Sequence, residues 1–210
     1  MINEKANQAI DKLAKICSII FHPLFIPLYG MVVIFSAPTL LGYLPFAVKK
    51  LLLLIVLIDN IILPISLLPF FKHKNLIGSW TLNERIERNI PLAISAILYS
   101  VTSFILFKLP IPLFLKSFIL SVCLLSIIIT LINLWWKISL HSVGVGVLNS
   151  LVIILAFKMY VSLLWYLIPV IIVGGLVLSS RLRLNAHNPR QVWLGFLTGL
   201  FGLAVFMTMF

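Results

Sequence analysis

Charged side chains are scarce in this sequence, and acidic side chains are the scarcest. Only 10% of the 210 residues are charged, and five Asp and Glu stand against 16 Lys and Arg. A soluble globular domain carries about 25% charged residues, so this chain cannot cover a water-facing surface with polar groups. Because carboxylates are so few and the four histidines are not at ligand spacing, we expect no metal site and no cofactor.

Cysteine is also nearly absent. The two cysteines, Cys17 and Cys123, lie inside apolar runs, where a thiol behaves as a small hydrophobic side chain. This placement argues against a disulfide framework and against a thiolate metal site. We also expect no cleavable signal peptide, because the first apolar run lacks a small-residue cleavage site and further apolar runs follow it.

Apolar residues are abundant, at 62% of the chain. A helix needs about 20 apolar residues to cross the hydrocarbon core of a bilayer, so the chain has room for six or seven spans and little else. We therefore predict an all-α, polytopic integral membrane helical bundle that forms a single domain over residues 1–210. The expected spans cover residues 17–37, 47–70, 91–108, 113–135, 142–157, 161–178 and 191–210.

The N-terminal segment 1–16 is more polar than the apolar runs that follow it. Its apolar residues recur at helical spacing, with lysines on the remaining surface. This pattern is typical of an interfacial helix that leads into the membrane, and a frayed tail is the alternative. His22-Pro23 falls in the first turns of span one, where proline is tolerated or kinks a helix. We expect His22 to be a packing residue there.

Asp59 is the one carboxylate that falls near the centre of an expected span. A charge at that depth is costly and marks a candidate functional site. We expect Asp59 to pair with Arg88 or a histidine, or to stay protonated against Asn60. An ion or proton pathway around Asp59 is therefore one functional hypothesis.

Three polar stretches, at 83–91, 137–144 and 179–191, separate expected spans. Two expected spans separate the first stretch from the second, and two more separate the second from the third. An even number of crossings returns the chain to the same side, so all three stretches should meet one membrane face. The net charge of +11 then fits anionic lipid headgroups or a phosphate substrate better than nucleic acid, since no aromatic-basic groove is recognisable.

The side chains in these stretches suit phosphate chemistry. Guanidinium groups match phosphate oxygens in a bidentate manner. One histidine can act as a nucleophile while a second protonates a leaving oxygen. The candidate phosphate ligands are Arg85, Arg88, Lys137, Ser139, Ser180 and Arg181, and the candidate catalytic imidazoles are His141 and His187.

The third stretch resembles a signature of the type 2 phosphatidic acid phosphatase superfamily, which is Ser-Arg, five residues, His, three residues, Asp. Here Ser180-Arg181 is followed by five residues, His187, three residues and Gln191. The resemblance is greatest to a divergent prokaryotic branch with Lys-Ile-Ser-x-His and His-x-x-x-Gln motifs, and it covers residues 81–200.

The other two signatures of that superfamily have less complete counterparts. The second signature, Pro-Ser-Gly-His, aligns with Ile138-Ser139-Leu140-His141. The first carries a Lys followed by Arg-Pro, and its loose counterpart is Arg85-x-x-Arg88-x-x-Pro91. Lys137 has no exact counterpart in the signatures, and we add it on chemical grounds.

The resemblance implies a phosphatase-like core and a role for each matching residue. His187 would be the nucleophile that forms a phosphohistidine, and His141 would be the general acid. Arg181 and Ser139 would bind phosphate, together with Arg85 or Arg88. The implied substrate is a lipid phosphate or an isoprenyl (di)phosphate, and the implied location is the bacterial cytoplasmic (inner) membrane, with the membrane face left open by the distribution of cations.

Gln191 stands where the superfamily has the aspartate that orients the catalytic histidine. A glutamine offers an acceptor oxygen but no charge, and an Asp to Asn change in the serine-protease triad lowers the rate by about 10⁴. Two hypotheses follow. The chain is a membrane phosphatase in which His187, His141 and Gln191 are catalytic, or it is a non-catalytic lipid-phosphate binding or transport protein or a subunit of a membrane complex. Both make membrane lipids its partners, and a homo-oligomer is compatible with either.

Overall fold

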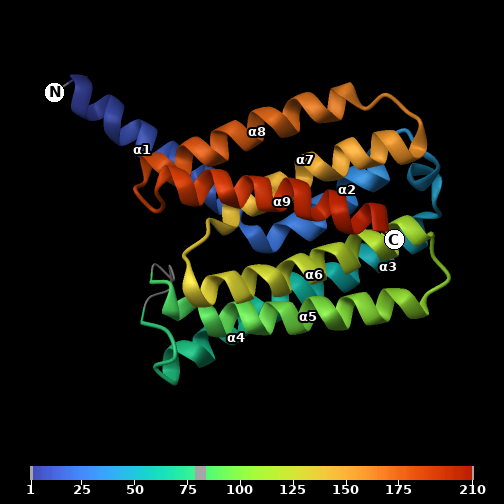
Figure 1. Ribbon diagram of the computed structural model, residues 1–210, viewed down its shortest axis with the longest axis horizontal. Coiled ribbons are helices and arrows are strands. Elements are labelled where there is room, and N and C mark those ends of the chain that lie inside the picture. Colours follow the sequence, from blue (N-terminus) through green and yellow to red (C-terminus); the bar gives the residue numbers. More distant parts are fainter. Residues whose placement is uncertain (1, 79–83, 210) are drawn as a thin grey trace.

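A computed structural model of the chain describes residues 2–78 and 84–209. Within these residues the chain forms helices joined by short connections, with no strand. Seven helical segments in this part of the chain are long and apolar enough to cross a membrane, which confirms the predicted all-α membrane bundle. Figure 1 shows the long helices lying alongside one another, with the α6–α7 and α8–α9 connections at the same end of the bundle.

The helices follow one another along the chain with few intervening residues. They are α1 (Ile2–Ile20), η1 (Pro23–Phe25), α2 (Ile26–Ser36), η2 (Leu40–Tyr43), α3 (Phe46–Leu57), η3 (Ile58–Ile62), α4 (Leu63–His73), η4 (Ile86–Arg88), α5 (Asn89–Lys108), α6 (Leu113–Trp135), α7 (Leu140–Met159), α8 (Leu164–Arg183) and α9 (Pro189–Met209). Helix α6 has the bounds that its apolar run predicts, whereas several other helices extend past the predicted ends.

Helix α7 lies at the centre of the bundle. About three quarters of its span is buried, 72%, against at most 44% for the other spans in the described residues. Small residues let α9 approach it closely: a Cβ on Gly199 would collide with the carbonyl oxygen of Val143, and one on Gly146 with that of Phe196. Because lipid is as apolar as a leucine side chain, such close packing is what holds helices together in a membrane.

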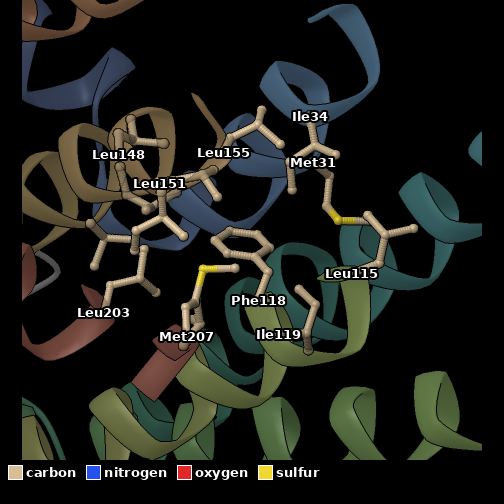
Figure 2. Packing of buried hydrophobic residues seen from close by; sticks show 14 of the residues in the cluster. Met31, Ile34, Leu115, Phe118, Ile119, Leu148, Leu151, Leu155, Leu203 and Met207 are labelled. Atoms are coloured by element: carbon tan, nitrogen blue, oxygen red, sulfur yellow. The ribbon is translucent and has the colours of Figure 1, made fainter. Parts of the chain in front are cut away.

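The main apolar core forms where α2, α6, α7 and α9 meet. Figure 2 shows the Phe118 ring of α6 among side chains from the other three helices. Phe118, Met31 and Leu151 are fully buried, and the absence of a side chain at Gly30 leaves room for the Phe118 ring. This core fixes the relative positions of the helices whose ends carry the polar residues.

The first span differs from its prediction. Helix α1 continues without a break to Ile20, past the expected end of the interfacial segment at residue 16. The chain then breaks at His22, which caps η1, with Pro23 in the first position of that turn. Proline lacks an N–H and fixes φ, so it starts a new helix more readily than it continues an old one. The break therefore lies within the segment that the sequence predicts as one continuous span.

Helix α1 packs against α8 through polar contacts near its beginning. Arg183 forms an ion pair with Asp11 and donates a hydrogen bond to its Oδ1 over 2.7 Å. It donates a second hydrogen bond to Asn7 Oδ1 over 3.0 Å. Both charged side chains are more than two fifths exposed, so the pair contributes at most about 1 kcal/mol to stability. It nevertheless fixes the register of α1 along α8.

The second span contains one turn of π-helix, η3, around Asp59. The hydroxyl group of Thr102 lies 3.2 Å from Asp59 Oδ2 and 3.1 Å from Asn60 Oδ1. Asp59 therefore meets a threonine of α5, a partner that the sequence analysis did not anticipate. None of these three side chains lines the cavity described below.

Candidate functional site

A cavity of about 740 Å³ lies among the helices of the bundle and carries charged and imidazole side chains at one end. Its apolar walls come from α4, α5, α6 and α7, for example Leu68, Leu92 and Val147. Along α5 the lining extends from Pro91 to Tyr99, a distance of about 12 Å at about 1.5 Å per residue. The cationic and imidazole side chains that line it are Lys15, His22, Arg88, His141, Arg181 and His187, and the hydroxyl groups that line it belong to Ser18, Ser95, Tyr99 and Ser126.

The turn between α8 and α9 presents His187 to this cavity. Helix α8 ends with Asn185 in the left-handed conformation at φ 50°, and the Ala186 and Asn185 amides donate to the carbonyls of Arg181 and Leu182. This is the Schellman arrangement, and asparagine is the common alternative to glycine at that position. His187 follows directly, one residue before the cap of α9.

Helix α9 begins with a capping box. The Gln191 amide donates to Asn188 Oδ1 over 2.9 Å, and the Asn188 amide donates back to Gln191 Oε1 over 3.3 Å. Proline at the first helical position, Pro189, completes a standard helix start. The residues that surround His187 therefore specify a rigid turn between two helices.

The same carbonyl oxygen of Gln191 binds His187. His187 Nδ1 lies 3.0 Å from Gln191 Oε1. The Asn188 amide can only donate a hydrogen bond, so the Gln191 atom that it meets is the acceptor oxygen Oε1. The same oxygen faces His187 and must accept a hydrogen bond from an Nδ1–H group. The proton of a neutral His187 is therefore on Nδ1, and Nε2 keeps its lone pair.

His187 is also held neutral. Its side chain is only 7% exposed, and its pKa is lowered from 6.5 to about 4, with burial as the largest cause. The charges of Arg88, Arg181 and Lys137 contribute to this lowered pKa, while the hydrogen bond to Gln191 opposes the shift. At neutral pH the ring is an uncharged imidazole with a free Nε2, which is the form that a nucleophile requires.

Arg181 supplies an unused hydrogen-bond donor beside His187. It lies in the last turn of α8, and its Nη1 donates to Ser18 Oγ over 3.2 Å. Its Nε atom is buried and has no hydrogen-bond partner among the described residues. A buried guanidinium N–H without an acceptor is costly, and an anion in the cavity would satisfy it.

His141 is held by the N-terminal helix. Its Nε2 lies 3.0 Å from the carbonyl oxygen of Ser18, and a carbonyl only accepts, so Nε2 carries a proton. Nδ1 is the ring nitrogen left for other partners. Ser18 therefore binds both His141 and Arg181, which gives α1 a direct role in positioning the site.

Two further cations lie at this end of the bundle. Arg88 is buried at 7% exposure and lines the cavity. Lys137 is half-buried in the α6–α7 connection and does not line the cavity. Its pKa is lowered by burial first and then by the charges of Arg88 and Arg181, while Glu84 opposes the shift. These electrostatic effects show that Lys137 belongs to the same cationic cluster.

Three of the sequence-predicted phosphate ligands have structural partners and do not line the cavity. Arg85 donates to the carbonyls of Asn133 and Leu134 at the end of α6. The Ser180 hydroxyl donates to Leu176 of its own helix. The Ser139 hydroxyl accepts from Ser142.

Ser139 nevertheless connects two parts of the site. Its backbone N–H donates to the backbone carbonyl of Gln191 over 3.3 Å, and a Cβ on Gly195 would come within 2.8 Å of its carbonyl oxygen. The start of α7, which carries His141, is thereby attached to the start of α9. This contact fixes the separation between His141 and the His187–Gln191 pair.

The sequence analysis missed the contribution of α1 and η1. Lys15 and Ser18 line the cavity from one face of α1, at a helical spacing of three residues, and His22 lines it from the break that follows α1. That spacing was visible in the sequence, but an apolar run gives no sign of which face meets a polar site. From the sequence alone, these residues are therefore expected only in the first span and its interfacial leader.

The arrangement suits an anion rather than a metal ion. In the part of the chain that the structure describes, no three His, Cys, Asp or Glu side chains are grouped closely enough to hold a metal. Guanidinium and imidazole N–H groups instead converge from four elements on the polar end of an apolar cavity. Comparison with known proteins adds no assignment, since no protein-family model, curated protein or solved structure matches this chain.

Proposed function

We propose that this protein is a membrane phosphatase of the type 2 phosphatidic acid phosphatase kind, acting on a lipid phosphate or an isoprenyl (di)phosphate. The observation that carries the proposal is the convergence of Arg88, His141, Arg181 and His187 on the polar end of one apolar cavity. The sequence resemblance assigns roles to these same residues. A cavity that is cationic at one end and lined mainly by apolar side chains along about 12 Å of α5 suits a phosphorylated lipid.

The proposed reaction begins when the lipid phosphate enters from the bilayer. Arg181 and Arg88 bind the phosphate oxygens, and the tail occupies the apolar part of the cavity. His187 Nε2 then forms a bond to phosphorus while the bond between phosphorus and the lipid oxygen breaks. That oxygen takes the electron pair and receives a proton from Nδ1 of a protonated His141, whose Nε2–H stays on Ser18.

The second step releases phosphate. Water attacks the phosphohistidine and passes a proton to His141, and the bond between phosphorus and Nε2 breaks. The electron pair returns to Nε2, so both histidines regain their starting states. Inorganic phosphate and the dephosphorylated lipid are the products.

Gln191 supports the geometry of this reaction without supplying charge. In the serine-protease triad, the loss of about 10⁴ on changing Asp to Asn came largely from the wrong imidazole tautomer. Here the tautomer is set correctly, because the Asn188 amide turns Oε1 of Gln191 toward the ring. What a glutamine lacks is the electrostatic stabilisation of the positively charged ring in the phosphohistidine.

The capping box that contains Gln191 favours a second candidate function. The capping box gives Gln191 a structural role that would persist in a protein which binds a lipid phosphate without hydrolysing it. Such a protein would be a binding or transport protein or a subunit of a membrane complex. It would hold the phosphate on Arg181 and release none.

We infer that the site faces one surface of a bacterial cytoplasmic (inner) membrane, where lipid phosphates are available in either leaflet. The test uses purified protein in detergent with phosphatidate, phosphatidylglycerol phosphate or undecaprenyl diphosphate, and it measures released phosphate. The wild type should turn over at least one of them, and His187→Ala should not. His73→Ala, at an exposed histidine of α4 that does not line the cavity, is the matched control. Failure to hydrolyse any substrate, combined with tight binding, would favour the second candidate.

A further inference from the structure

His22 lies at the break between α1 and α2 and lines the same cavity as His141, Arg181 and His187. Its side chain is exposed, although it sits inside the first membrane-crossing segment. Pro23 follows it and starts η1, so the backbone at His22 is held in an extended conformation between two helical segments. The proposed reaction does not use this imidazole.

The backbone fixes the tautomer of His22. The Leu24 amide donates to His22 Nδ1 over 3.4 Å, and an amide can only donate. Nδ1 must therefore carry the lone pair, and the proton of the neutral ring is on Nε2. Because Nδ1 is turned toward its own backbone, Nε2–H lies at the far side of the ring.

The surroundings of the ring belong to the phosphate site. The ring centroids of His22 and His141 are 5.5 Å apart, with the planes at 84°. The charge of Arg181 acts on His22, His141 and His187 alike. A neutral N–H donor next to a guanidinium is a group that an anionic oxygen would accept from, since hydrogen bonds to charged acceptors are the stronger ones.

We propose that His22 is a third imidazole of the phosphate site, which donates its Nε2–H to an oxygen of the bound phosphate. This inference rests on the phosphate site proposed above. It adds to that site a phosphate-binding residue, His22, that lies outside the three polar stretches 83–91, 137–144 and 179–191. His22 needs no change of protonation for this role. It orients the phosphate from the break that follows α1.

The alternative is that His22 only caps η1, and two variants separate the two roles. The side-chain oxygen of Asn reaches the place of Nδ1, so His22→Asn keeps the cap and removes the distant donor. The side-chain nitrogen of Gln reaches the place of Nε2, so His22→Gln keeps the distant donor and loses the cap. A capping role and a phosphate-binding role therefore predict opposite rankings of the two variants.

The experiment measures binding of decyl phosphate and of decanol to the detergent-solubilised wild type and to both variants. Removing a hydrogen bond to a charged oxygen should weaken decyl phosphate binding about 10-fold or more in His22→Asn. His22→Gln should stay within about 3-fold of the wild type. Decanol affinity should be the same in all three proteins, because it reports the apolar part of the cavity alone. Thermal unfolding of each variant shows that it is folded.

The proposal would be overturned if His22→Asn bound decyl phosphate as tightly as the wild type does. It would also be overturned if only His22→Gln lost affinity for decyl phosphate. The result for His22 can be distinguished from the result for the proposed phosphatase function. A wild type that binds decyl phosphate but hydrolyses no lipid phosphate would remove the phosphatase function, while the Asn and Gln variants still decide the role of His22. A wild type that does not discriminate decyl phosphate from decanol would overturn both.

Discussion

His187 donates its Nδ1–H to the same carbonyl oxygen of Gln191 that accepts the Asn188 amide at the start of α9. One oxygen thus caps a helix and sets a tautomer. This coupling lets the neutral side chain of Gln191 orient the His187 ring and leave Nε2 of His187 available. It also means that the orientation of His187 depends on the integrity of the cap.

Replacing Gln191 by Glu should raise catalysis. The isosteric carboxylate keeps the capping box and adds a negative charge 3.0 Å from the ring nitrogen. An opposite charge at this range raises the pKa of a histidine by about 1–3 units, so the His187 pKa should move up from about 4. The checks are a histidine NMR titration and the rate of phosphate release, with Gln191→Met as the variant that loses cap and acceptor together. An unchanged titration in Gln191→Glu would contradict the contact.

The acid side of the pH profile should lie unusually low. In the proposed reaction His187 must be neutral, and its pKa in the free protein is about 4, so the acid limb of kcat/KM should begin only as the pH approaches that value. A free histidine would instead impose a fall near pH 6.5. Measurements of kcat/KM between pH 4 and 8 on a lipid monophosphate distinguish the two.

The same pKa shift links stability to pH. The folded-state pKa of His187 is below its ordinary value, so between pH 6.5 and pH 4 the unfolded chain binds a proton that the folded protein does not. Stability from this group is therefore complete above about pH 6.5 and is lost as the pH falls toward 4. The unfolding temperature of wild type should drop more between pH 7.5 and 4.5 than that of His187→Gln. Parallel curves would show that the ring is not held neutral.

Arg181 should not tolerate lysine. Its Nε–H is buried without a partner among the described residues, and lysine cannot present the two parallel donors of a guanidinium. We expect Arg181→Lys to lower kcat/KM by about 10–100-fold, the value of a bidentate charged hydrogen bond. Arg183→Lys, two residues further and paired with Asp11, is the matched control and should be near wild type. Equal losses in the two variants would point to a general effect of lysine in the last turn of α8.

Arg85 and Arg88 should separate into a structural and a ligand-binding residue. Arg85 binds the carbonyls that end α6, so Arg85→Ala should lower the unfolding free energy by about 2 kcal/mol with little change in phosphate affinity. Arg88 lines the cavity, so Arg88→Ala should weaken binding of decyl phosphate. Thermal unfolding and ligand binding are measured on both, and the reverse pattern would exchange their assignments.

Long apolar runs made most of the fold predictable from the sequence. Helix α6 has its predicted bounds. The even number of spans between the polar stretches predicted that they share one face, and His141, Arg181 and His187 line one cavity. The end of α8 was missed, because hydropathy falls at Ser179 while the helix continues to Arg183. There the Schellman turn at Asn185, rather than the polarity of the residues, ends the helix.

Contacts between distant polar groups were not predictable. Nothing in the apolar sequence around Ser18 shows that its carbonyl and hydroxyl oxygens hold His141 and Arg181. Nor does sequence distinguish Arg85, which completes a helix end, from Arg88, which faces the cavity. These assignments depend on how helices rotate about their axes, which the packing of α1, α5 and α8 determines.

The central claim is that Nε2 of His187 becomes phosphorylated. Purified protein is mixed with a lipid monophosphate labelled on phosphorus, quenched in alkali, where phosphohistidine survives, and digested for mass spectrometry. The account predicts a phosphate on the peptide that contains His187, which disappears on acid treatment and is absent from His187→Gln but present in His73→Gln. Phosphate release by the wild type without any such label, or equal release by His187→Gln, would contradict the account.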